Sequence, residues 1–123
     1  MTDIAIWVVQ GLLALAMLAA GTMKAATPRD RLMARMEWVG RFPPLVPRLI
    51  GIAEVAGAIG LVAPQALDVL PVLTPVAGAC LAVLMAGAVK VHLDEGRPLR
   101  GIVPGVFGLL ALVVAIGRGA GLA

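Results

Sequence analysis

Four apolar segments dominate this chain and leave few folds open to it. They cover residues 4–23, 49–63, 70–91 and 102–116, and only 14% of all residues are charged. In soluble domains about a quarter of the residues are charged, whereas a membrane-spanning helix needs about 20 apolar residues. We therefore expect an all-α membrane protein, a bundle of four transmembrane helices that forms one domain over residues 1–123.

The expected spans cover about 4–26, 48–64, 70–93 and 101–117. The second and fourth apolar segments are short, so their ends must recruit flanking residues or the bundle must thin the bilayer locally. No basic residue precedes Lys24, and the first apolar run is longer than the core of a signal peptide. We therefore expect the first segment to be retained as a span.

Basic residues are distributed unevenly between the two sides of the expected bundle. Nine of the ten Lys and Arg residues lie in or beside the first and third connections, and Arg118 is the exception. The positive-inside rule makes that side cytoplasmic, in the inner (plasma) membrane of the cell, and places both termini outside. The net charge of +3 follows from this asymmetry, so it is no sign of nucleic-acid binding.

The first connection carries a helical pattern of its own over residues 28–40. Its apolar residues recur at helical spacing, and its charged residues lie largely elsewhere around the helix. We expect an amphipathic interfacial helix on the cytoplasmic surface of the membrane, with Trp38 at headgroup level. The alternative is a basic loop that charge alone holds near anionic lipid.

Gly101, Gly105 and Gly108 place small residues along one side of the fourth span. Small residues allow two membrane helices to approach each other closely. Packing within the bundle is the favoured explanation, and a homodimer through this glycine-lined helix is the alternative.

Glu54 is the one charged residue inside the second apolar segment. A carboxylate at membrane depth must be neutral or have a partner, and such groups mark functional sites by default. Lys24, Lys90 and His92 lie near the ends of two other spans and should reach the same cytoplasmic half of the bundle. Nothing of the kind is expected in the outer half. The sequence therefore predicts a polar pocket near the cytoplasmic side.

Helical spacing places small residues around these polar groups. We expect such residues to admit a ligand or a neighbouring helix, and we assign them to substrate binding. They are Gly51, Gly57 and Ala58 beside Glu54, and Gly21 beside Lys24.

Whether Lys90 or His92 lines the pocket stays open, because the two are two residues apart and point in nearly opposite directions. Each polar residue also has a structural alternative. Lys24 and Lys90 can extend to the headgroups, and His92 can be an interfacial residue bonded to a carbonyl group. For Glu54 the alternative is a purely structural ion pair with Lys24.

Several chemistries find little support in the sequence. Cys80 is the only cysteine, so no intramolecular dithiol relay can operate. A single histidine without a Cys/His cluster predicts no metal site. No glycine-rich nucleotide motif is present. No cofactor is evident, and a bound quinone or a haem ligated by His92 are alternatives without direct support.

Short motifs connect the polar and small residues of the spans. They are Gly21-x-x-Lys24, Gly51-x-x-Glu54-x-x-Gly57-Ala58-x-Gly60-Leu61, Leu70-Pro71-x-Leu73-Thr74-Pro75 and Val91-His92-Leu93. Together they resemble the DoxX-like family of small four-helix membrane proteins, over most of the chain. The resemblance implies four spans and places Lys24, Glu54 and His92 at the polar positions of the pattern. Relatives are linked to quinone-coupled sulfur oxidation or to thiol and oxidative-stress complexes, but this chain lacks a cysteine pair.

Two functions from different classes fit these residues. In the first, an enzyme, Glu54 is the general acid/base on a small lipophilic or weakly anionic substrate, His92 is a second proton donor, and Lys24 or Lys90 binds an oxygen. Isomerisation, epoxide opening and redox work on a bound quinone all fit this group. The second is a small-molecule transporter or a non-catalytic membrane subunit of a redox complex. An exporter of aromatic cations is disfavoured, because aromatic residues make up only 3% of the chain.

Overall fold

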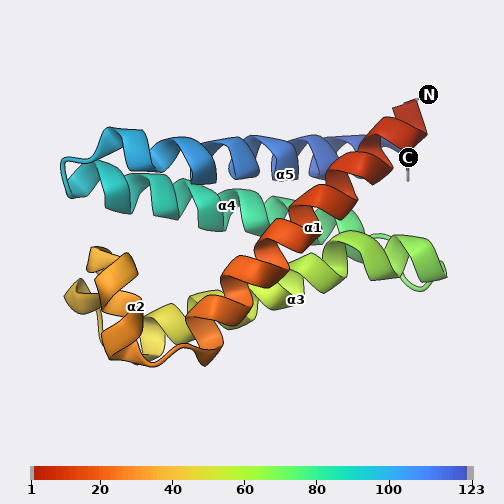
Figure 1. Ribbon diagram of the computed structural model, residues 1–123. Coiled ribbons are helices and arrows are strands. Elements are labelled where there is room, and N and C mark those ends of the chain that lie inside the picture. The colour runs from red at the N-terminus through yellow and green to blue at the C-terminus, as the bar shows by residue number, and fades with distance from the viewer. Residues whose placement is uncertain (1, 122–123) are drawn as a thin grey trace.

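Four long helices form the chain, and each is long and apolar enough to cross a membrane (Figure 1). The computed structural model describes residues 2–121, apart from the side chains at positions 2, 29, 35, 37, 41 and 121. The long helices are α1 (Thr2–Ala26), α3 (Leu45–Leu67), α4 (Leu73–Asp94) and α5 (Ile102–Gly121). The all-helical fold and its four membrane-crossing helices are thus confirmed.

Flanking residues extend both of the short apolar segments. α3 begins at Leu45 and continues through Pro64, so that it reaches 23 residues. It ends where Asp68 adopts a left-handed backbone (φ 52°) and donates its N–H to the carbonyl oxygen of Pro64. α5 follows a short 3-10 helix, η2 (Pro98–Gly101), and a stretch of 23 residues there is apolar enough to span. Both segments therefore reach the length that a bilayer requires.

The helices form two closely packed pairs, α1 with α3 and α4 with α5 (Figure 1). In the first pair Gly21 and Gly51 face each other, and a methyl group added to either would lie 2.6 Å from the carbonyl oxygen of the other. In the second pair a methyl group on Gly78 would lie 2.8 Å from the carbonyl oxygen of Ala111. Glycine is required at these positions because one helix backbone rests directly on the next.

The glycine-lined side of the fourth span, formed by η2 and α5 (Gly101 in η2, Gly105 and Gly108 in α5), also lies inside the bundle. Methyl groups on Gly101 and Gly105 would lie 3.5 and 3.7 Å from the side chain of Val89, and one on Gly108 would lie 3.2 Å from Cβ of Met85. Both partners belong to α4 of the same chain. This side is therefore used for packing within the bundle, and the alternative of a homodimer through it finds no support.

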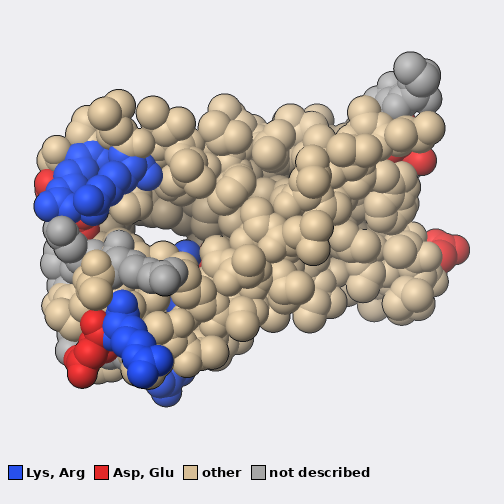
Figure 2. All heavy atoms as spheres, in the orientation of Figure 1, with Lys and Arg blue, Asp and Glu red and all other residues tan. Residues whose placement is uncertain are grey.

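The two pairs meet near one end of the bundle and lie apart at the other (Figure 1). We call the first the terminal end, because α1 begins and α5 ends there. We call the second the basic end, because Lys and Arg side chains gather at it (Figure 2). One apolar cluster joins the pairs in the middle of the bundle and consists of Leu13, Met17, Ala58, Leu61, Leu81, Met85, Ala111 and Val114.

The first connection forms two short helices where one was expected. α2 (Arg29–Arg35) ends at Met36, whose backbone is extended (φ −131°, ψ 93°). The 3-10 helix η1 (Glu37–Arg41) follows directly. The single helix expected over 28–40 is therefore interrupted, because an extended residue breaks the helical hydrogen-bond ladder.

The apolar side of this connection packs against the bundle. Leu32, Trp38 and Val39 are buried together, and their neighbours include Ile50 of α3 and Val91 of α4. Trp38 is only 8% exposed, so its ring packs against the protein, and its expected depth at headgroup level stays a prediction. The connection thus touches both helix pairs at the basic end.

Candidate functional site

Glu54 forms an ion pair with Lys24 inside the bundle. The Nζ atom of Lys24 lies 2.6 Å from Oε1 of Glu54, and the side chains are 13% and 1% exposed. The contact depends on the close approach of α1 and α3, since methyl groups on Gly21 and Gly51 would lie 2.9 Å from Cβ of Glu54 and of Lys24, respectively. The two glycines therefore bring the two charges together.

A chamber of about 500 Å³ lies next to this pair, between the two helix pairs and toward the basic end. Figure 2 shows an opening between the pairs on this side of the molecule. The ionisable residues that line the chamber are Lys24, Glu54, His92 and Arg100. The remaining walls are apolar or small: Met17, Ala20, Met36, Trp38, Phe42, Val46, Ile50, Leu84, Met85, Gly87, Ala88, Val91, Val103, Pro104 and Phe107.

His92 lines this chamber, and Lys90 does not. The Nδ1 atom of His92 is buried and has no hydrogen-bond partner within the described part of the chain. The Lys90 side chain is 76% exposed and pairs with Asp94 one turn later, at 2.8 Å between Nζ and Oδ2. His92 therefore shares the chamber wall with Lys24 and Glu54, and Lys90 lies on the outside.

The four small residues assigned to substrate binding do not line the chamber. Gly21 and Gly51 lie at the contact between α1 and α3. A methyl group on Gly57 would lie 2.7 Å from the side chain of Leu81, and Ala58 belongs to the apolar core. Neighbouring helices therefore occupy the space beside these small residues, as small residues in membrane helices allow, and a ligand does not.

Aromatic side chains are concentrated in the chamber. The chain has four of them, and three line its walls, namely Trp38, Phe42 and Phe107. The rings of Trp38 and Phe42 also contact each other edge to face, with centroids 6.0 Å apart. A low overall aromatic content does not indicate this concentration, because Trp38 and Phe42 belong to the connection and only Phe107 to a span.

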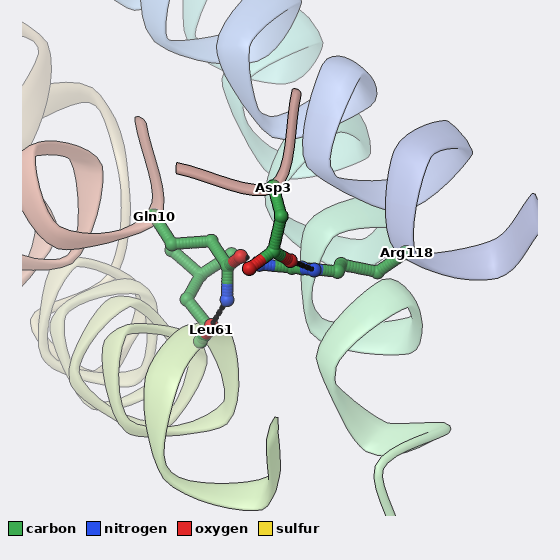
Figure 3. Close-up of polar contacts among 4 residues, drawn as sticks. All are labelled: Asp3, Gln10, Leu61 and Arg118. Carbon is green, nitrogen blue, oxygen red and sulfur yellow. Dashed lines mark hydrogen bonds and ion pairs between the residues drawn. The ribbon is translucent and has the colours of Figure 1, made fainter. Parts of the chain in front are cut away.

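A second polar network joins α1 to α5 at the terminal end (Figure 3). Arg118 donates from Nη1 to Oδ1 of Asp3 at 2.5 Å and from Nε to Oε1 of Gln10 at 2.7 Å. Gln10 in turn donates to the carbonyl oxygen of Leu61 in α3 at 2.6 Å. The guanidinium carbon also lies 4.9 Å from the ring centre of Trp7, which is a cation–π distance.

This network overturns the expectation that ionisable side chains converge only in the half of the bundle around Glu54. Gln10 is fully buried, and the Arg118 side chain is only 10% exposed. Two signals in the sequence pointed to it. Asp3 and Gln10 are seven residues apart and share one helix face, and Arg118 is the single basic residue on its side of the chain.

No metal site is evident in the part of the chain that the structure describes. Its His, Cys, Asp and Glu side chains form no group of three that could hold an ion. Cys80 is a free and exposed thiol on α4, and it does not line the chamber. The Cys80 thiol is therefore not positioned to react with a ligand bound there.

Comparison with known protein families shows to which family the chain belongs. The model of the DoxX-like family matches residues 8–114. The chain belongs to the DoxX-like family. This match includes Lys24, Glu54 and His92, and it leaves Asp3 and Arg118 of the terminal-end network outside. No curated protein and no solved structure matches this DoxX-like chain.

Replacement of Arg118 by Met should destabilise this DoxX-like protein by about 1–3 kcal/mol, because Oε1 of the buried Gln10 loses its donor. Unfolding of the purified protein in detergent, followed by circular dichroism during titration with sodium dodecyl sulfate, measures the change. Asp3→Asn is the matched control. The Asp3 side chain is 67% exposed, so its loss should cost less than about 1 kcal/mol. A larger effect for Asp3→Asn than for Arg118→Met would contradict this account.

Proposed function

We propose that this protein binds a small lipophilic molecule in the chamber and performs acid/base chemistry on it through Glu54. The supporting observation is the burial of the Glu54–Lys24 pair in the wall of a largely apolar chamber that His92 also lines. Ionisable groups inside a membrane protein are costly and mark functional sites by default. The chamber volume, about 500 Å³, falls in the range of small-molecule sites.

Glu54, His92 and Lys24 each have a separate task in this proposal. Lys24 contacts Oε1 of Glu54, which leaves Oε2 to a ligand in the chamber. Glu54 removes a proton from the ligand, and Nδ1 of His92 supplies one at a second position. Lys24 stabilises negative charge that develops on a ligand oxygen. Removal of a proton at one carbon and delivery of a proton at another gives an isomerisation. Removal of the proton on the carbon beside an epoxide, together with protonation of the epoxide oxygen, forms a C=C bond, breaks the C–O bond and gives an allylic alcohol. In both cases the proton on Glu54 then returns to His92 through solvent.

The basic end faces the cytoplasm in this proposal, in accordance with the positive-inside rule. The chamber then lies in the cytoplasmic half of the membrane. Export would need a route from the chamber to the terminal end, and the buried side chains Leu13, Leu61 and Leu81 fill the space between them. Because no open path crosses the apolar core, the structure favours a reaction inside the chamber over transport across the membrane.

Exchange of hydrogen for deuterium tests the proposed proton transfer without a chosen substrate. The protein in lipid nanodiscs is incubated in heavy water with a lipid extract of the cells that express it. Mass spectrometry should then find a component that gains deuterium. Glu54→Gln should slow this gain at least about 100-fold, because a general acid/base contributes about 10² to 10⁴ in rate.

Lys90→Gln is the matched control, because Lys90 is exposed and lies outside the chamber. It should leave the exchange rate unchanged. Size-exclusion chromatography checks that both variants remain folded. Equal exchange by wild type and Glu54→Gln would remove Glu54 from the chemistry, and the absence of any exchange with the wild type would contradict the proposal itself.

A further inference from the structure

We infer that the occupant of the chamber is a single-chain amphiphile with a negatively charged head group, such as a long-chain carboxylate. It enters from the surrounding lipid between α1 and α5, and Arg100 holds its head group at the basic end. The inference rests on the proposed binding function of the chamber and adds the class of ligand and its route.

The route follows from where α1 and α5 touch each other. Near the terminal end they are in contact, since a methyl group on Gly117 would lie 2.8 Å from Cδ1 of Ile6, and Arg118 bonds to α1. Toward the basic end the chamber lies between them, with Ala20 of α1 and Val103 of α5 in its walls. Figure 2 shows the molecule open between the two helix pairs in this region. An apolar chain can therefore enter at a depth where both helices face lipid.

On the α5 side, exposed apolar side chains border the opening between the two helix pairs. The side chains of Ile102 and Val103 are 57% and 59% exposed at the start of this helix, which is the stretch that borders the chamber. Exposed apolar surface of this kind faces hydrocarbon when a helix spans a membrane. A ligand dissolved in the bilayer therefore reaches the chamber without crossing water.

The sign of the head group follows from the charges that line the chamber. Lys24 and Glu54 compensate each other through their ion pair. The other two ionisable lining residues, His92 and Arg100, are basic, and Arg100 has no ion-pair partner among the described side chains. A guanidinium group binds carboxylate or phosphate oxygens through two parallel hydrogen bonds. An anionic head group therefore complements this end of the chamber.

The positions of Arg100 and Glu54 separate the head group from the reacting group. Arg100 belongs to η2, outside the long helices at the basic end. Glu54 lies nine residues inside α3, about 14 Å along its axis. The carboxylate of the ligand and the position on which Glu54 acts are thus different parts of one molecule. The chamber, at about 500 Å³, has the size of small-molecule sites, which suits one chain better than the two of a phospholipid.

Quenching of Trp38 fluorescence by a brominated fatty acid tests the inference. Trp38 of η1 lines the chamber, whereas Trp7 lies near the start of α1, at the terminal end. A Trp7→Phe background therefore leaves Trp38 as the only tryptophan. This protein, in phosphatidylcholine nanodiscs, is titrated with brominated stearic acid. We expect saturable quenching, and Arg100→Gln should raise the half-saturating concentration about two- to fivefold, as expected for loss of one exposed ion pair.

Arg48→Gln is the matched control, because Arg48 is an exposed arginine on α3 that does not line the chamber. It should leave the titration unchanged. Brominated stearyl alcohol, which has the same chain without the charge, separates the two proposals. If the alcohol binds as tightly as the acid and Arg100→Gln has no effect, the inferred head group is wrong and the binding function stands. If neither compound quenches saturably, or brominated phosphatidylcholine quenches equally well, the inferred ligand class is wrong. The proposed function then fails only if the wild type also shows no deuterium exchange.

Discussion

Lys24→Met is expected to lower the free energy of unfolding by about 3–5 kcal/mol. The substitution leaves the carboxylate of Glu54, which is 1% exposed, without its partner at 2.6 Å. Breaking a buried ion pair from one side is costly because the remaining charge is neither solvated nor compensated. Titration of the detergent-solubilised protein with sodium dodecyl sulfate, followed by circular dichroism, measures the loss.

The double variant Lys24→Met with Glu54→Leu is the control for this prediction. It should recover most of the stability, because apolar replacement of a whole buried pair is often neutral or better. Lys90→Met, which breaks the exposed pair with Asp94, should cost only about 0.3–0.5 kcal/mol. A double variant as unstable as Lys24→Met would show that the stability does not depend on charge compensation. A stable double variant that no longer catalyses deuterium exchange would support a functional role for the pair.

Gly21→Ala is expected to destabilise the protein by about 1–3 kcal/mol, the range found for overpacking. Its methyl group would lie 2.6 Å from the carbonyl oxygen of Gly51 and 2.9 Å from Cβ of Glu54. The nearest of these atoms belongs to the backbone of α3, so the two helices must separate. The same denaturant titration gives the change in stability.

Gly11→Ala is the matched control in the same helix, since a methyl group at Gly11 would meet nothing within 4 Å. It should be neutral or stabilising by up to about 1 kcal/mol, because alanine favours the helix over glycine. Similar losses for both variants would indicate that glycine flexibility matters in α1, and that the contact with Gly51 does not.

The fold could be predicted from the sequence because hydrocarbon allows so few solutions. A segment of sufficient apolar length must form a helix in a bilayer, so four such segments predict four helices whatever contacts they make. The Glu54–Lys24 pair could be anticipated from the sequence for a similar reason. An isolated carboxylate in an apolar helix needs a partner, and few candidates lie at a suitable depth.

The contacts between the helices could not be predicted from the sequence, because the same pattern of small residues is compatible with several different contacts. Gly21 and Gly51 could have admitted a ligand, and they hold α1 against α3 instead. The interruption at Met36 and the burial of Trp38 depend on contacts with α3 and α4, which local periodicity does not contain. The chamber likewise arises from the separation of two helix pairs, which is a property of three-dimensional packing.

The terminal-end network has a consequence for the order in which the bundle is assembled. Arg118 is 108 residues from Gln10 and 115 from Asp3, so the two bonds connect the first long helix to the last. During synthesis α1 is inserted long before α5 leaves the ribosome. The contact between Gln10 and the carbonyl oxygen of Leu61 needs only α1 and α3, whereas the contact with Arg118 needs α5 as well. The last helix to be made therefore completes the hydrogen bonding of the first.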